Sequence, residues 1–156
     1  MVKLLAIKSQ WAVLLYALLD LLCIGLGMGM PIFCLLFGLP VGWFIARKVS
    51  TEHQEVEKTL RDILKWASFT SGFTFLIMFA IWGWSVSLLF DPSAELANFG
   101  MPLLLYEPKA SFIGWLVLMI FISPFLQLLM TVFGAHLTLL WQVRREAVYT
   151  NWHSVS

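Results

Sequence analysis

Charged residues are scarce in this chain. Asp, Glu, Lys and Arg make up 12% of its 156 residues, whereas hydrophobic residues make up 60%. Soluble domains are typically about 25% charged and about 45–50% apolar. The composition therefore argues against an ordinary soluble domain and predicts a protein that has a lipid bilayer as its solvent.

Sequence signals for catalysis and for nucleic-acid binding are also missing. The formal net charge is only +1, without the clustered excess of Lys and Arg that nucleic acids attract. The chain has three histidines and two cysteines, and it contains no H-E-x-x-H, G-x-S-x-G or C-x-x-C motif. We expect no nucleic-acid partner, no enzymatic activity and no cofactor.

Two cysteines flank a pair of methionines. Cys23 and Cys34 lie on either side of Met28 and Met30, and thiolates and thioethers are soft ligands that suit Cu(I). A copper site or a disulfide is chemically conceivable here. Cysteine as a small buried hydrophobe and methionine as a gap filler account for the pattern more simply, so we predict no metal site.

Three long stretches carry almost no charge. They cover residues 9–46, where Asp20 is the only charged residue, residues 66–90, and residues 110–143, which include His136. As one helix the first stretch would be about 55 Å long, nearly twice the hydrocarbon thickness of about 30 Å. It must therefore fold back on itself.

The turn in the first stretch is marked by glycine and proline. Gly25, Gly27 and Gly29 permit backbone conformations closed to other residues, and Pro31 suits the first turn of a new helix. We predict helices over residues 9–27 and 31–47, joined by a tight hairpin. One strongly tilted helix followed by a re-entrant segment is the alternative. No strand precedes the glycines, which argues against a nucleotide-binding loop.

The remaining stretches each predict a single crossing. Thr51 and Gln54 have the spacing of a capping box, so the third helix is predicted over residues 51–90 with a cytoplasmic extension. The fourth is predicted over residues 111–143 with a kink at Pro124, after an outer loop of residues 91–110. The expected fold is an all-α integral membrane protein: one membrane domain over residues 1–156, forming a four-transmembrane-helix bundle.

The positive charges orient this bundle. Four crossings place all but one of the Lys and Arg residues on a single side, and Lys109 alone falls on the other. Because cytoplasmic flanks are enriched in Lys and Arg, we predict that both termini are cytoplasmic. The N-terminus also resembles a signal peptide, but Asp20 interrupts its apolar run, and we expect the first helix to be retained.

Three polar side chains are predicted within the membrane: Asp20, Gln127 and His136. A carboxylate near the bilayer centre costs several kcal/mol, so Asp20 should face the interior, paired or protonated. Counting residues from the flanking charges puts Asp20 between His136 and Gln127 in depth. An Asp20–His136 contact is one hypothesis, and the other is that these groups are polar fasteners between helices.

The predicted helix over residues 31–47 carries a pair of glycines at the spacing of a helix-packing motif. Gly38 and Gly42 form a G-x-x-x-G pair, which lets helix backbones approach closely, although Pro40 lies between them. We predict that this face packs against another helix. Ser68, Thr70, Ser71 and Thr74 give the third helix a polar face that also suits helix packing.

Two functions are compatible with these patterns. The first is a non-catalytic accessory or scaffold subunit, with the bilayer and other membrane subunits, or further copies of itself, as partners. The alternative is a small oligomeric transporter or channel protomer with a polar path around Asp20, Gln127 and His136. The surroundings of Asp20 discriminate between them, since a water-filled cavity favours transport and a dry hydrogen-bonded contact favours the subunit.

Overall fold

The computed structural model describes residues 9–27, 31–52, 56–96 and 105–153, which are almost entirely helical and contain no strand. Four helical stretches make up these residues: α2 (Ser9–Gly27); α3 (Pro31–Glu52); α4 (Val56–Trp82) with its 3-10 continuation η1 (Gly83–Phe90); and α5 (Pro108–Val117), the π-helical turn η3 (Leu118–Ile122) and α6 (Ser123–His153) in one run. The all-α part of the prediction is confirmed.

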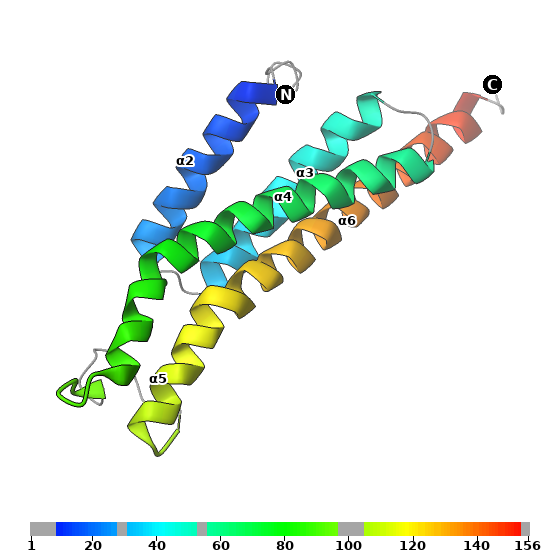
Figure 1. Cartoon of the computed structure of the whole chain (residues 1–156). Coiled ribbons are helices and arrows are strands. Elements are labelled where there is room, and N and C mark those ends of the chain that lie inside the picture. The colour runs from blue at the N-terminus through cyan, green and yellow to red at the C-terminus, as the bar shows by residue number, and fades with distance from the viewer. Residues whose placement is uncertain (1–8, 28–30, 53–55, 97–104, 154–156) are drawn as a thin grey trace.

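The helices run up and down, with the chain ends at one end of the bundle. Figure 1 shows both termini and the connection between α3 and α4 at this end. The continuous stretches α4–η1 and α5–η3–α6 extend beyond the turn between α2 and α3 at the other end (Figure 1). Helices α2 and α3 diverge toward the start of α2 (Figure 1), while Tyr16 of α2 stacks on Phe37 of α3. Two long helical stretches are thus accompanied by two shorter helices.

The first hairpin has the predicted helix limits. Helix α2 ends at Gly27 and α3 begins at Pro31, while Gly29 lies outside the described residues. Gly25 is within α2, where no other side chain or helix comes within 4 Å of a Cβ added to it. Its freedom from contact indicates that it does not mediate helix packing.

Other helix limits differ from the prediction. Helix α3 continues past residue 47 to Glu52, and α4 begins at Val56 rather than at Thr51. Thr51 belongs to the last turns of α3, where its hydroxyl donates to the Lys48 carbonyl oxygen (2.6 Å). A threonine hydroxyl can bond a preceding carbonyl as readily as it caps the next helix, which explains the misplaced start. At the C-terminus α6 extends to His153, beyond the predicted residue 143.

Helices α3 and α6 are in backbone contact. A Cβ on Gly38 would lie 2.9 Å from the Gln127 carbonyl oxygen, and a Cβ on Gly42 would overlap the Thr131 carbonyl oxygen. From the other helix, a Cβ on Gly134 would lie 2.8 Å from the Leu39 carbonyl oxygen. Gly38 and Gly42 therefore lie at the closest helix contact, while Pro40 is exposed on another face.

Pro124 follows a π-helical turn instead of interrupting the last helix. The Ser123 amide donates to the Leu118 carbonyl five residues earlier, and the Ser123 hydroxyl donates to the same carbonyl (2.8 Å). The wider turn accommodates a residue that lacks an N–H and crowds the preceding turn. The single continuous helix that the sequence predicted is thus retained, and Figure 1 shows it changing direction near this point.

The connection after η1 begins with a local turn. Asp91 Oδ1 accepts hydrogen bonds from the Ser93 hydroxyl (2.6 Å) and the Ser93 amide (2.9 Å). These two bonds, led by the hydroxyl, hold the pKa of Asp91 below its ordinary value.

Two helical stretches are long and apolar enough to cross a membrane, Val56–Phe90 and Pro108–Arg145. The apolar part of α2, Trp11–Gly25, is shorter. Many large apolar side chains lie on the outside of the helices, including Leu18 (60% exposed), Phe79 (54%) and Leu140 (68%).

Candidate functional site: a buried polar cluster and an apolar cleft

Asp20 is buried between helices and hydrogen-bonded. Only 1% of its surface is exposed, and its Oδ2 accepts a hydrogen bond from the Thr74 hydroxyl of α4 (2.9 Å). Thr74 itself is completely buried. The carboxyl group therefore lies between α2 and α4 rather than on the outside of the helices.

Tyr16 links this pair to a third helix. Its hydroxyl accepts a hydrogen bond from Gln127 Nε2 of α6 (2.8 Å) and lies 2.9 Å from the Thr74 hydroxyl. It can donate its own proton to the Thr70 carbonyl oxygen (2.8 Å). We call Tyr16, Asp20, Thr74 and Gln127 the polar cluster, and it joins α2, α4 and α6.

Each donor atom of the polar cluster has at least one acceptor. The Thr74 hydroxyl donates to Asp20, the Tyr16 hydroxyl to the Thr70 carbonyl, and the Gln127 amide to Tyr16. On the α6 side, Gln127 Oε1 and the nearby Thr131 hydroxyl are buried without a protein partner. Buried hydrogen-bonded polar groups of this kind hold helices together where no water competes.

His136 lies outside the polar cluster. It is exposed, and its Nδ1 is 2.8 Å from the Val132 carbonyl oxygen of its own helix. The structure does not bring it to Asp20. The depth estimate behind that hypothesis ignored direction: Gln127 and His136 are nine residues apart, and at about 100° per residue they point to opposite sides of α6.

The sequence reasoning overlooked Tyr16 as a member of the cluster. Tyr16 and Asp20 are four residues apart, as are Thr70 and Thr74, so each pair shares a helix face. This spacing is the signal that could have linked Asp20 to a tyrosine and to the polar face of α4. The spacing alone does not tell which helices are neighbours in the fold.

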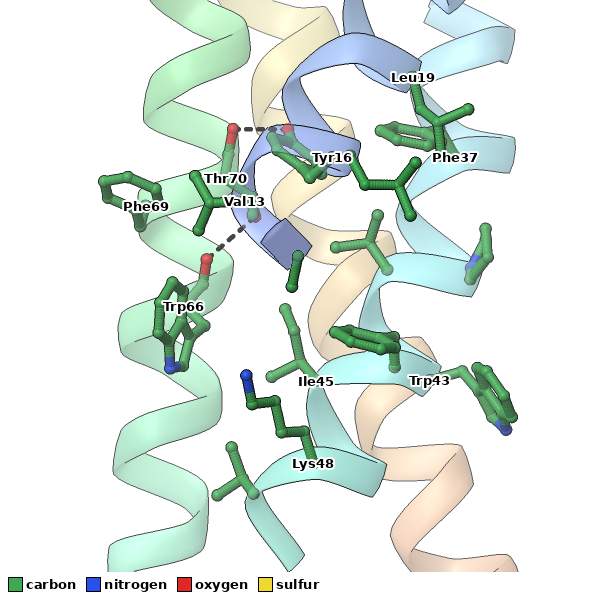
Figure 2. Close-up of a pocket in the computed structure, with 16 residues that line it drawn as sticks. Val13, Tyr16, Leu19, Phe37, Trp43, Ile45, Lys48, Trp66, Phe69 and Thr70 are labelled. Atoms are coloured by element: carbon green, nitrogen blue, oxygen red, sulfur yellow. Dashed lines mark hydrogen bonds between the residues drawn. The ribbon is translucent and has the colours of Figure 1, made fainter. Parts of the chain in front are cut away.

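An apolar cleft of about 370 Å³ lies beside the cluster, between residues 12–19 of α2, residues 37–49 of α3 and residues 66–70 of α4. Tyr16 and Thr70 contribute to its wall together with aromatic side chains such as Phe37, Phe44 and Trp66. Asp20 and Gln127 are not among its lining residues. Figure 2 shows the cleft with Tyr16 towards one end and Lys48 at the other.

Two neighbouring cations at the end of α3 have different surroundings. The Arg47 guanidinium lies over the rings of Trp43 (5.6 Å) and Trp141 (5.5 Å), and Arg145 also lies over Trp141 (5.4 Å). Lys48 instead lines the cleft. Arg47 is thus held against indole rings, and its Nε is buried without a hydrogen-bond partner. Lys48 is directed to the cleft (Figure 2).

The two cysteines are free thiols on different helices, Cys23 partly buried in α2 and Cys34 buried in α3. Across the described ranges, no three His, Cys, Asp or Glu side chains gather as they would around a metal ion. Cys34 packs with Ile24 and Met78 in an apolar core cluster.

No protein-family model matches the chain, and no curated protein or solved structure is significantly similar to it.

Proposed function

We propose that this chain is a multi-pass membrane protein with four spanning helices and both termini in the cytoplasm. The end of the bundle that holds both termini and the α3–α4 connection also carries Arg47, Lys48, Lys58, Arg61, Lys65, Arg144 and Arg145. The connection at the far end carries Asp91, Glu95 and Glu107 among its charged residues. This asymmetry follows the preference of cytoplasmic segments for Lys and Arg.

Within the membrane we propose that the protein is a non-catalytic subunit or scaffold of a larger membrane assembly. The observation that carries this proposal is the buried, hydrogen-bonded setting of Asp20, which bonds to Thr74 and does not line the cleft. A polar group that joins helices in this way is a fastener, and a substrate path would need it to face an accessible space.

The transporter or channel reading receives less support. It requires Asp20, Gln127 and His136 to surround one polar path. Asp20 and Gln127 are 1% and 0% exposed, whereas His136 is exposed on the opposite face of α6. Along the described helices these three side chains therefore do not converge on one space, which argues against a shared path within a single protomer.

The apolar exterior supplies surfaces for neighbouring subunits. Aromatic and aliphatic side chains on the outside of α4 and α6, such as Phe79 and Phe133, are more than half exposed. Lipid can cover such residues, and so can the helices of another subunit. Other membrane proteins, or further copies of this chain, are the proposed partners.

Native purification tests the proposal. The affinity-tagged chain is extracted from its source membranes in mild detergent, and co-purifying proteins are quantified by mass spectrometry against an unrelated tagged multi-pass protein. We expect stoichiometric recovery with at least one other membrane protein, for the wild type and for Asp20→Asn alike.

Recovery as a monomer or homo-oligomer, combined with ion or solute flux in liposomes that Asp20→Asn abolishes, would overturn the subunit proposal in favour of transport. Asp20→Asn is suited to this comparison because asparagine has the size of aspartate and can still accept the Thr74 hydrogen bond.

A further inference from the structure

We infer that the apolar cleft between α2, α3 and α4 holds one acyl chain of an anionic phospholipid from the cytoplasmic leaflet, whose phosphate pairs with Lys48. This inference rests on the proposed membrane placement, in which the cleft occupies the cytoplasmic half of the bundle. It adds a specific lipid site to the proposed function.

The cleft wall suits a hydrocarbon chain. Its lining side chains are nearly all apolar, and they come from three helices: Ala12, Val13, Leu15, Leu19, Phe37, Val41, Phe44, Ile45, Val49 and Phe69 among them. The Tyr16 hydroxyl at the inner end is already hydrogen-bonded to Gln127 and Thr70. No polar group there calls for a polar ligand, so burial of apolar surface provides the driving force.

The length of the cleft suits an acyl chain. Its wall follows α3 from Phe37 to Val49, about 18 Å at 1.5 Å per residue. One leaflet accounts for half of the hydrocarbon thickness of about 30 Å. A single acyl chain of the cytoplasmic leaflet can therefore lie along the whole wall.

Charge identifies the head group. Lys48 is the cation that lines the cleft, and Figure 2 shows its side chain running along Ile45 with the ammonium group directed between α3 and α4. No ion pair joins it to an acidic side chain within the described parts of the chain. Trp43 and Trp66 also line this end, and indole rings favour the head-group level of a bilayer. A basic pocket between helices on the cytoplasmic side is suited to an anionic lipid.

Native mass spectrometry tests the inference directly. The full chain is reconstituted in vesicles of equal parts dioleoyl-phosphatidylglycerol and dioleoyl-phosphatidylcholine, released in mild detergent, and its retained lipids are counted. We expect one phosphatidylglycerol to be retained in preference to phosphatidylcholine. Lys48→Gln should reduce this preference about fivefold, the effect of one lysine near an anionic surface.

Two further variants separate this site from general attraction. Lys65→Gln removes an exposed lysine at the same end of the bundle that does not line the cleft, and it should leave retention unchanged. Val13→Trp fills the cleft and should displace the lipid whatever its head group. Equal losses for Lys48→Gln and Lys65→Gln, or retention of the lipid by folded Val13→Trp, would overturn the inference.

A free fatty acid also combines an acyl chain with an anionic group, so it is tested as an alternative ligand by adding oleic acid to the vesicles. Retention of oleic acid in place of phosphatidylglycerol would overturn the phospholipid assignment.

Failure of the lipid site is distinguishable from failure of the proposed function. If alkaline carbonate strips the chain from membranes, both fail, whereas an integral chain that retains no phosphatidylglycerol contradicts the lipid site alone.

Discussion

The buried Asp20 carboxyl group and the Thr74 hydroxyl form a hydrogen bond between two helices. A carboxyl group within a bilayer costs several kcal/mol unless it has partners, and the Thr74 hydroxyl supplies a hydrogen bond to it from the neighbouring helix. The same hydroxyl lies within hydrogen-bond distance of Tyr16, which accepts from Gln127. Removal of one hydroxyl therefore affects contacts among three helices.

We expect Thr74→Val to lower the free energy of unfolding by about 1–3 kcal/mol, because it leaves buried polar groups without a partner while preserving side-chain volume. Asp20→Asn, which can still accept the Thr74 bond, should cost less. Both are measured by reversible unfolding in mixed micelles.

Thr138→Val is the matched control for this substitution. Thr138 is also buried, but its hydroxyl bonds only to the Gly134 carbonyl of its own helix (2.7 Å). Its loss should cost under about 1 kcal/mol. Equal costs for the two threonines would show that the polar cluster does not join the helices.

At the scale of helices, α3 and α6 form the tightest pair. Gly38 and Gly42 lie against the backbone of α6 between Gln127 and Ala135, and Gly134 lies against the backbone of α3. Close approach increases dispersion contacts along the pair, which is the main source of helix association where lipid is as apolar as the side chains. The same approach brings α6 into position for Gln127 to reach Tyr16.

Gly42→Ala should destabilise the bundle by about 1–3 kcal/mol, because the added methyl group overlaps the Thr131 carbonyl and forces α3 away from α6. Gly72→Ala is the control: nothing lies within 4 Å of its Cβ. It should be neutral or stabilise α4 by up to about 1 kcal/mol. The free energy of unfolding is compared for the two variants, and a Gly42→Ala protein as stable as Gly72→Ala would contradict close packing.

Taken as a whole, the molecule gathers its termini and most of its positive charges at one end. The lengths of Val56–Phe90 and Pro108–Arg145 suit a membrane crossing, and the placement of the shorter α2 and α3 beside them belongs to the proposal. The orientation is testable independently of any function.

For this test, Cys23 and Cys34 are replaced by alanine, and single cysteines are introduced by Ser93→Cys or Glu57→Cys. Both native positions are exposed, at opposite ends of α4–η1. In intact cells a membrane-impermeant maleimide should label position 93, and it should label position 57 only after permeabilisation. The reverse pattern, or labelling of both positions from outside, would contradict the proposed orientation.

The sequence alone determined the helical class and the approximate course of the chain. Charge-free runs, the glycine-rich turn before Pro31 and the spacing of Gly38 and Gly42 are local signals, because each reflects the conformation or packing of a single helix. Helix limits were less predictable where Thr51 could serve either of two helices.

Only the tertiary structure decided which polar groups meet. Depth along a helix placed Asp20 near both Gln127 and His136, but rotation about the α6 axis turns Gln127 inward and His136 outward. The partners of Asp20 come from helices far apart in sequence, and their neighbourhood follows from how α2, α4 and α6 pack. Three helices form the wall of the cleft that ends at Lys48. The sequence of any one of these helices therefore does not predict the cleft.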